Sequence, residues 1–532
     1  MVEKKKTFAE GKIWKIILSQ AIPLMLAQLV QLLYNVVDRI FIGHMDKNDS
    51  TALTGVGLTF PIISFIIAFA ALFGLGGVPL FSIANGAGKK DEAERILGNS
   101  FVLLIISSII LTAIGYIFCK PILYLLGASD SSYIYAADYL YVYFAGTIFV
   151  MLNTGLNGYI PAQGYPKIGM LTTIIGAIIN LILDPIFIFV LNWGIKGAAF
   201  ATVLSQIVSI IWILRFLTNS NTPLRLKKEN IRFDSKISWD ICKLGISNFI
   251  MQGTNCFVQA ACNTTLEIYG GDIYVGIMTV MNSIRDIFWL PISGLVGGSQ
   301  PVTGYNYGAK LYNRVKSAIK FNMFCGMTYT SIAWILIVVF PKIFFKMFSS
   351  DEALLGAGVP AIRTYFFGFI FMSFQFSGQS TFQALGKAKQ AIFFSLLRKA
   401  IIVIPLTLIL PRIGMGVNGV FIAEPISNAV GGLASFLTMY FTIYRKLGKT
   451  KENESEKEKE KEKEKESENE SEKEKDVEIE INEEINNEIE DDDEKINDKE
   501  INKEMGNDKK IDDKKVDKEI EDDKKIDDKD IV

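Results

Sequence analysis

Four polar residues stand within otherwise apolar stretches in the first half of the chain. Asp38 lies in the first stretch, Asn180 and Asp184 lie in a later one, and Thr202 lies in the next. In a helix, the four-residue spacing of Asn180 and Asp184 puts both side chains on one face. Two carboxylates, an amide and a hydroxyl can supply oxygen ligands to a small hard cation, and two neighbouring carboxylates can instead share a proton. We therefore expect a site for a small cation or a proton here.

A structural role is the alternative for the same residues. An ionisable group at membrane depth costs about 2.5–3.5 kcal/mol on insertion scales, so such groups are the first candidates for function. Polar side chains can also hold a helix bundle together by hydrogen bonds between helices. Asp184 precedes Pro185, and its carboxylate could bind backbone groups that the proline leaves without partners. The pattern alone favours function.

The second half carries a different set of charged residues in its apolar stretches. They are Arg285, Asp286, Arg398, Lys399 and Glu424. Glu424 follows Thr202 by 222 residues, the offset of an internal repeat described below, so the two halves have diverged at this position. The simplest interpretation pairs Glu424 with Arg398, and Arg285 with Asp286 or another neighbour. A role for Glu424 as a ligand of a cation or a substrate is the alternative.

Membrane-spanning helices are the elements that must position these residues. The chain has 532 residues, 50% of them hydrophobic, even though the segment after about Thr450 is almost entirely polar. One soluble core could not bury that much apolar surface, whereas a lipid bilayer covers it. Apolar runs of spanning length lie at 14–42, 53–83, 97–126, 134–160, 167–191, 194–218, 240–268, 273–303, 316–347, 356–384, 388–411 and 415–443.

Basic residues gather in alternate loops between these runs. One such loop holds Lys89, Lys90 and Arg95, and the stretches before the first run and after the last run are also basic. Lys and Arg mark the cytoplasmic loops of a membrane protein. We therefore expect a multi-pass protein of the plasma (inner) membrane with both termini in the cytoplasm, which requires an even number of spans.

The two halves of the chain repeat each other at a nearly constant offset. Gly164 corresponds to Gly386, and the stretch 194–197 (GIKG) corresponds to 416–419 (GVNG), both at an offset of 222. Parallel repeats of this kind flank a central cavity in transporters. We expect an all-α membrane protein of two six-helix bundles related by pseudo-two-fold symmetry, at 1–225 and 226–449. The charged segment 450–532 has too few apolar residues to form a core and is expected to be a disordered cytoplasmic tail.

Other kinds of site find little support in the composition. The chain has a single histidine, His44, and none of its five cysteines forms a CxxC pair, which argues against a histidine- or cysteine-ligated metal centre. No cluster of catalytic residues at one membrane interface suggests an enzyme, and a channel would not need paired carboxylates within a duplicated architecture. We expect no cofactor and no nucleic-acid partner.

Five stretches carry a resemblance to a known family. They are 22–23 (IP), 33–43 (LYNVVDRIFIG), 176–185 (GAIINLILDP), 298–310 (GSQPVTGYNYGAK) and 423–426 (AEPI). Together they resemble the multidrug and toxic compound extrusion (MATE) family, most closely its prokaryotic branch typified by a staphylococcal multidrug efflux pump, and the resemblance covers about residues 10–445. It implies twelve helices in two bundles around a V-shaped cleft, and export of organic cations driven by Na⁺ or H⁺.

The resemblance also implies where the coupling cation binds. In members with a cation site in the first bundle, the corresponding residues here are Asp38, Asn180, Asp184 and Thr202, with Tyr139 nearby. Another branch uses acids in the seventh and tenth helices. This chain departs from that branch, because after the first residue of its seventh run, Asp240, the only acid is Glu267, near the outer end, and its tenth run has no acid.

The resulting prediction is a secondary active transporter that exports organic cations by antiport with Na⁺ or H⁺. We expect small, cationic, amphipathic substrates, contact with the lipid bilayer, and a monomer. The candidate substrate-cavity residues are Tyr34, Asn35, Gln300, Arg398 and Glu424. The alternative within the same superfamily is a flippase for lipid-linked precursors or oligosaccharides, which would need a strongly cationic central cavity to bind phosphates.

Overall fold

The computed structural model describes residues 8–43, 51–348 and 352–447, all within one compact unit, Met1–Lys451. These residues form helices joined by short connections, with no β-strand among them. His44 and the charged segment 450–532 lie outside the described residues.

The first half contains six long helical segments. Their elements are α1 (Ile13–Gly43), α2 (Thr51–Phe73) and α3 (Gly77–Gly86), α4 (Lys90–Leu125), α5 (Asp130–Leu156) and α6 (Tyr159–Ala162), α7 (Pro166–Pro185) and the π-helical η1 (Ile186–Val190), and α8 (Gly194–Thr218). A short 3₁₀ turn, η2 (Lys228–Asn230), follows before the second half.

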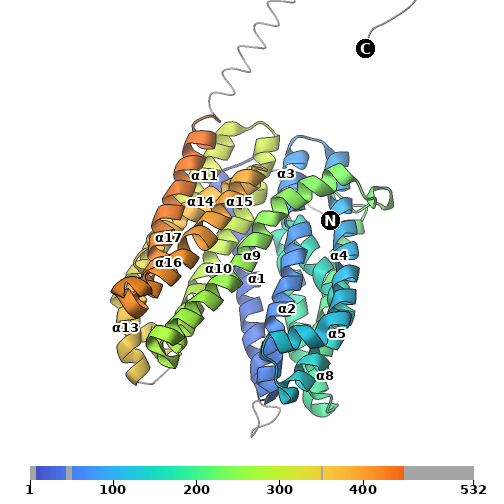
Figure 1. The fold of residues 1–532 in the computed structure, drawn as a ribbon. Coiled ribbons are helices and arrows are strands. Elements are labelled where there is room, and N and C mark those ends of the chain that lie inside the picture. Colours follow the sequence, from blue (N-terminus) through green and yellow to red (C-terminus); the bar gives the residue numbers. More distant parts are fainter. Residues whose placement is uncertain (1–7, 44–50, 349–351, 448–532) are drawn as a thin grey trace, which may run out of the picture. The chain divides into compact units, whose positions relative to one another are not determined.

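The second half repeats this arrangement. Its elements are α9 (Ser235–Gly270), α10 (Asp272–Gly308), α11 (Tyr312–Val339), α12 (Pro341–Lys346), α13 (Glu352–Phe366), η3 (Phe369–Phe371), α14 (Met372–Ala384), α15 (Ala388–Leu396), η4 (Leu397–Val403), α16 (Ile404–Ile409), η5 (Pro411–Met415), α17 (Gly416–Met439) and η6 (Tyr440–Tyr444). In Figure 1 the helices of the first half, such as α2, α4, α5 and α8, lie on one side, and α11 to α17 lie on the other.

The lengths of these helices match a membrane-spanning fold. Among the described residues, ten helical segments are long and apolar enough to cross a membrane by length and composition. The other two long helices, α9 and α10, have 36 and 37 residues. At about 1.5 Å per residue each exceeds the roughly 30 Å of a hydrocarbon core. The expectation of about twelve spanning helices in two bundles is confirmed.

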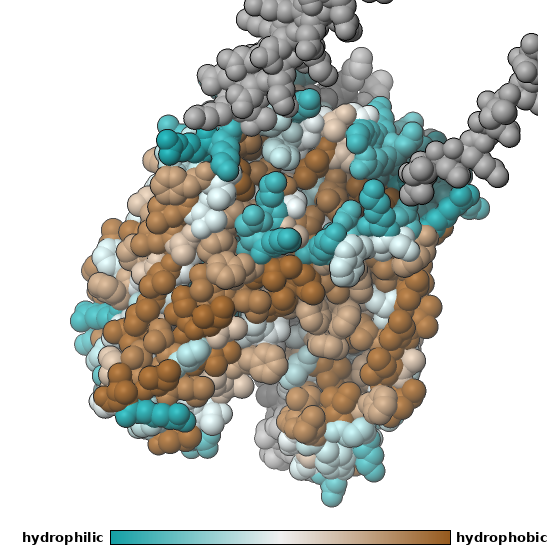
Figure 2. Space-filling model, turned by 45° about the horizontal axis from the view of Figure 1, so that its top comes forward, coloured by the Kyte–Doolittle hydropathy of each residue, from teal (hydrophilic) through white to brown (hydrophobic). Residues whose placement is uncertain are grey.

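Two large apolar cores lie mainly in different halves of the chain. One large cluster of buried residues runs from Val56 to Ile241, and a second runs from Val258 to Phe421. Many large apolar side chains outside these cores are exposed. Figure 2 shows these brown surfaces below a band of hydrophilic residues that gathers at one end. Such an apolar belt is the surface that lipid covers.

The two bundles contact each other at one end of the long helices. The backbones of α1 and α10 approach so closely at Gly298 that a Cβ there would lie 2.6 Å from the backbone nitrogen of Ala21. At Gly245 of α9 a Cβ would lie 1.8 Å from the backbone oxygen of Leu72, so only glycine permits this approach. Figure 2 shows a hollow between the two bundles at the opposite end. We call this hollow the interbundle cleft.

The connection between the bundles is fixed to the start of α4. Nζ of Lys227 lies 2.6 Å from Oε2 of Glu94, and Nη2 of Arg95 lies 2.7 Å from Oδ2 of Asp234. The hydrogen bond and the negative charge of Glu94 raise the pKa of Lys227. Asp234 caps α9, since its Oδ1 accepts hydrogen bonds from the backbone N–H groups of Ile237 and Lys236. These bonds, together with Arg95, lower the pKa of the Asp234 carboxyl.

Candidate functional site

A buried polar cluster lies among the helices of the first bundle. Nδ2 of Asn180 donates a hydrogen bond of 3.1 Å to Oδ1 of Asp184. Their exposed fractions are 0% and 1%. One turn of α7 separates them, so helical geometry alone aligns the amide with the carboxylate. Asp184 is thereby held in one orientation beside the first helix.

Helix α1 brings a second carboxyl group to this pair. Asp38 is half-buried, and its carboxyl group interacts directly with that of Asp184. The packing of α1 against α7 produces this contact, although the two residues are 146 positions apart in the sequence. Two acidic groups this close at membrane depth cannot both stay charged without a cation or a proton between them.

Hydroxyl groups complete the cluster. The hydroxyl of Tyr139, on α5, shares a hydrogen bond with the side chain of Thr202, on α8, and Tyr139 also lies within electrostatic range of Asp38. Tyr34 lies one turn before Asp38 on α1 and interacts with both Asp38 and Asp184. We call Tyr34, Asp38, Tyr139, Asn180, Asp184 and Thr202 the first-bundle cluster.

Tyr143 belongs to the same neighbourhood but was not predicted as a site residue. It interacts with Tyr34, and its ring stacks near that of Tyr139, with centroids 6.1 Å apart. The spacing of Tyr139 and Tyr143 is i, i+4, which places both on one face of α5. That spacing was the available signal. It could not be separated from packing because α5 is rich in aromatic residues.

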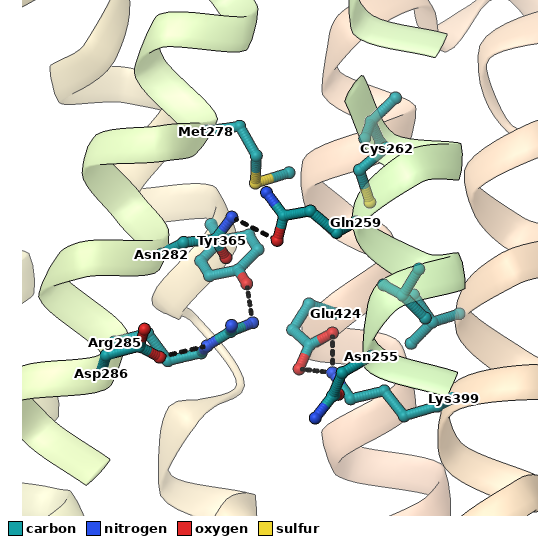
Figure 3. A pocket seen from close by; sticks show the side chains of 13 residues that line it. Asn255, Gln259, Cys262, Met278, Asn282, Arg285, Asp286, Tyr365, Lys399 and Glu424 are labelled. Atoms are coloured by element: carbon teal, nitrogen blue, oxygen red, sulfur yellow. Dashed lines mark hydrogen bonds and ion pairs between the residues drawn. The ribbon is translucent and has the colours of Figure 1, made fainter. Parts of the chain in front are cut away.

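A second polar site lies within the other bundle. A cavity of about 220 Å³ is lined by residues of α9, α10, α13, η4 and α17. Figure 3 shows its polar side chains, which include Asn255, Gln259, Asn282, Arg285 and Glu424. We call it the second-bundle cavity.

Glu424 lies at the centre of the ionic contacts at this cavity. Nζ of Lys399 lies 3.1 Å from Oε1 and 3.2 Å from Oε2 of Glu424, and Nη1 of Arg398 lies 3.6 Å from Oε1. The same Nη1 donates a hydrogen bond of 2.7 Å to Oδ1 of Asn428. The predicted pairing of Glu424 with Arg398 is therefore present, but Lys399 makes the closer contact. Lys399 was not predicted as a site residue.

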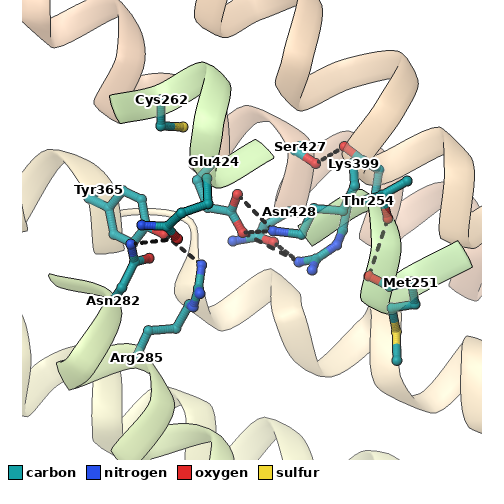
Figure 4. Close-up of polar contacts among 12 residues, drawn as sticks. Met251, Thr254, Cys262, Asn282, Arg285, Tyr365, Lys399, Glu424, Ser427 and Asn428 are labelled. Carbon is teal, nitrogen blue, oxygen red and sulfur yellow. Dashed lines mark hydrogen bonds and ion pairs between the residues drawn. The ribbon is translucent and has the colours of Figure 1, made fainter. Parts of the chain in front are cut away.

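Arg285 faces the same cavity from α10. Its Nη1 donates a hydrogen bond of 3.0 Å to the hydroxyl of Tyr365, and its Nε lies 3.7 Å from Oδ1 of Asp286. One turn away, Nδ2 of Asn282 donates a hydrogen bond of 3.0 Å to Oε1 of Gln259. Figure 4 shows Arg285 and Lys399 reaching toward Glu424 from different helices.

The family model described as MatE matches residues 23–186 and 248–409. The chain belongs to the MatE family. MATE multidrug exporters are transporters, not enzymes, so this chain is a multi-pass membrane efflux transporter that acts on small molecules.

Individual relatives of this MATE transporter share its full helical region. The multidrug export protein MepA of Staphylococcus haemolyticus (strain JCSC1435) is 26% identical over 81% of this chain and 94% of its own length. MepA of Staphylococcus aureus (strain NCTC 8325 / PS 47) is 27% identical over 81% of this chain and 95% of its own. A crystal structure of a MATE protein in the bent conformation is 25% identical, covers 84% of this chain and 99% of its own, and superposes with a TM-score of 0.79.

The other candidate residues of this MATE transporter lie in different places. Gln300 lies on α10, where its Nε2 donates a hydrogen bond of 2.7 Å to Oε1 of Gln383. Gln383 in turn donates one of 2.8 Å to Oδ1 of Asn248, near the end where the bundles meet. Asn35 lies on α1, but its side chain is outside the described set.

The described part of this transporter contains no obvious set of ligands for a divalent or transition metal ion. No three His, Cys, Asp or Glu side chains gather there in a way that could hold a metal ion. The first-bundle cluster offers two carboxylates, one amide and hydroxyl groups. That set suits a monovalent cation or a proton better than a divalent ion that needs six or more oxygen ligands.

Proposed function

We propose that this transporter exports organic cations by antiport, with Na⁺ or H⁺ binding at the first-bundle cluster. The contact between Asp38 and Asp184, with Asn180 hydrogen-bonded to Asp184, is the observation that carries the proposal. A cation or a proton relieves the repulsion between these two carboxyl groups. Antiport further requires only that the ion and the exported solute favour different conformations of the protein.

Helix α1 is the element that would connect the ion site to the movement of the bundles. It packs against α7 of its own bundle and against α10 of the other. Asp38 lies in the later part of α1, whereas Ala21, in its earlier part, lies in close contact with Gly298 of α10. Binding of an ion at Asp38 changes the contacts of α1 within its own bundle. Because α1 also packs against α10, the position of α10 relative to α1 then changes as well.

The membrane arrangement follows from the loops. We take residues 1–225 and 226–449 as the two bundles, with the charged tail 450–532 outside them and both termini in the cytoplasm. The bundles meet near the basic loops at 88–95 and 310–316, so the interbundle cleft would open to the outside of the cell membrane. In this state an external ion reaches the first-bundle cluster. We expect the protein to act as a monomer.

Efflux from proteoliposomes tests the proposal. Ethidium, a fluorescent organic cation, is loaded, and the Na⁺ and pH gradients are imposed separately. We expect one gradient to drive efflux and Asp38→Asn to abolish it. The matched control is Asp138→Asn, the same change in the same bundle at a residue paired with Lys196 on the surface. Full efflux by folded Asp38→Asn protein would refute the proposed ion site.

A lipid-linked flippase is the second candidate function. The observation in its favour is that three basic side chains, Arg285, Arg398 and Lys399, interact with Glu424 at the second-bundle cavity, since a flippase needs cations to bind phosphates. The carboxyl pair in the first bundle favours the export of cations instead. Absence of ethidium movement under either gradient, from well-folded protein, would favour the flippase.

A further inference from the structure

Basic groups outnumber acidic groups at the second-bundle cavity. The charged groups that interact there are Arg285, Asp286, Arg398, Lys399 and Glu424. Glu424 is the only buried acid among these five, while the side chain of Asp286 is 63% exposed. Three basic groups therefore face two carboxylates, of which only Glu424 is buried, so the five groups carry one excess positive charge. Uncompensated charge at membrane depth is costly, and an anion would relieve it.

We propose that the second-bundle cavity binds an oxyanion, a carboxylate or a phosphate, carried by the solute that the protein exports. This inference rests on the proposed export function, because it assigns a chemical group to the exported solute. It concerns a different bundle from the cation site, so the two sites are separable by experiment.

Arg285 is the group placed to receive the oxyanion. Its side chain is 25% exposed, whereas Lys399 and Glu424 are buried and satisfy each other. Its Nη1 is bonded to Tyr365, and its Nε is 3.7 Å from Asp286, beyond hydrogen-bond distance. Its Nη2 donates no hydrogen bond to any of the described residues. A guanidinium group with free N–H donors binds carboxylate and phosphate oxygens in a forked geometry.

The other polar side chains fit the same purpose. Asn255, Gln259 and Asn282 line the cavity beside Arg285, and their amide groups can donate hydrogen bonds to an oxyanion. Apolar residues such as Val258, Met278 and Val420 close its other walls. This mixture of a few polar groups and an apolar wall is typical of small-molecule sites.

The size of the cavity limits what it can hold. At about 220 Å³ it is smaller than the roughly 300–1,000 Å³ of sites that enclose a whole drug-sized molecule. It can hold the charged end of a solute while the rest lies in the interbundle cleft. The exposed side chain of Asp286 beside Arg285 shows that other parts of the protein do not cover this part of α10. Exported solutes would then include zwitterions and not only simple cations.

A pair of ligands that differ only in the negative charge tests the site. We would measure by calorimetry, with purified full-length protein, the binding of para-trimethylammoniobenzoate and of its methyl ester, which is the same cation without the carboxylate. We expect the zwitterion to bind about tenfold more tightly than the ester. Arg285→Gln should remove this preference by weakening the binding of the zwitterion.

Arg363→Gln is the matched control, because Arg363 is exposed on α13 and its Nε binds the backbone oxygen of Val338 away from the cavity. The preference should persist in this variant. Equal binding of zwitterion and ester by the wild-type protein would overturn the proposal without relying on any variant. A preference that survives in folded Arg285→Gln protein would overturn it as well.

Two further comparisons identify the source of the oxyanion and separate this inference from the proposed function. We would measure zwitterion binding in nanodiscs of neutral lipid and in nanodiscs of anionic lipid. If the zwitterion binds more weakly in anionic lipid, and Arg285→Gln removes this difference, a lipid phosphate is supported as an occupant. Equal binding in both would support a carboxylate on a soluble solute. Because these measurements use no gradient, failure of ion-driven efflux would refute antiport and leave the oxyanion site standing.

Discussion

Nζ of Lys399 lies within 3.2 Å of both carboxylate oxygens of Glu424, and both residues are buried in the second bundle. Arg398 is the next nearest cation, at 3.6 Å. Removal of one partner from a buried ion pair leaves the other charge without compensation, which costs far more than the pair itself contributes.

The first prediction concerns this pair. Lys399→Met should lower the free energy of unfolding by about 3 kcal/mol, because Glu424 keeps only the more distant Arg398. Adding Glu424→Gln to the same chain should restore part of the loss. Denaturant unfolding in detergent measures both. Lys196→Met is the control, since its pair with Asp138 is exposed and should contribute less than about 1 kcal/mol. Additive losses in the double variant would contradict the expected coupling.

The sequence predicted the elements better than it predicted the contacts between them. Runs of apolar residues determine spanning helices, so the long helices and the two bundles followed from hydropathy and the repeat. The i, i+4 spacing of Asn180 and Asp184 also fixed their contact within α7. Asp38 was predicted as a site residue because a charged side chain at membrane depth costs free energy. Its contact with Asp184 depends on how α1 packs against α7, and spacing does not encode that.

Lys399 shows what a sequence could not resolve. Arg398 and Lys399 are adjacent, and either could have been the closer partner of Glu424. They lie in η4, a π-helical segment (Leu397–Val403), whose wider turn changes the direction of each side chain from that in an α-helix.

The second prediction concerns Thr202 in the first-bundle cluster. Thr202→Val keeps the shape of the side chain but removes the hydrogen bond with Tyr139. A lost hydrogen bond of about 0.5–1.5 kcal/mol should raise the ion concentration for half-maximal efflux about threefold to tenfold. Ethidium efflux at graded concentrations of the driving ion measures this. Thr218→Val, at the exposed end of the same helix, should leave the value unchanged. An unaltered value in Thr202→Val would remove Thr202 from the ion site.

The third prediction concerns pH and the connection between the bundles. Backbone hydrogen bonds from Ile237 and Lys236, together with Arg95, lower the pKa of Asp234 in the folded protein. Because the pKa of Asp234 is lower in the folded protein, its charged carboxylate stabilises the fold at pH values above the unfolded-state pKa of about 3.9. This stabilisation is lost as the pH falls through the folded-state pKa. Asp234→Ala should therefore be less stable than wild type at pH 7, and the difference should narrow in acid.

Thermal unfolding of both proteins from pH 7 down to about pH 3 measures this difference. Asp234→Asn separates the two contributions, because asparagine still caps a helix but carries no charge to pair with Arg95. Its stability should fall between those of the other two proteins at pH 7. If the difference in stability between wild type and Asp234→Ala stays constant across the whole pH range, the charge of Asp234 does not help to hold the connection between the bundles in place.

The fourth prediction concerns the contact between α1 and α10. A Cβ at Gly298 would lie 2.6 Å from the backbone nitrogen of Ala21 and 2.8 Å from its Cα, and a backbone cannot move aside as a flexible side chain can. Gly298→Ala should therefore force the two helices apart, lower the free energy of unfolding by about 1–3 kcal/mol, and reduce ethidium efflux. The neighbouring glycine supplies the control, because a Cβ at Gly297 would meet only the end of the Leu24 side chain at 3.4 Å. Gly297→Ala should keep most of the stability and transport. Equal behaviour of the two variants would show that the close approach of α1 and α10 is not needed for the transport cycle.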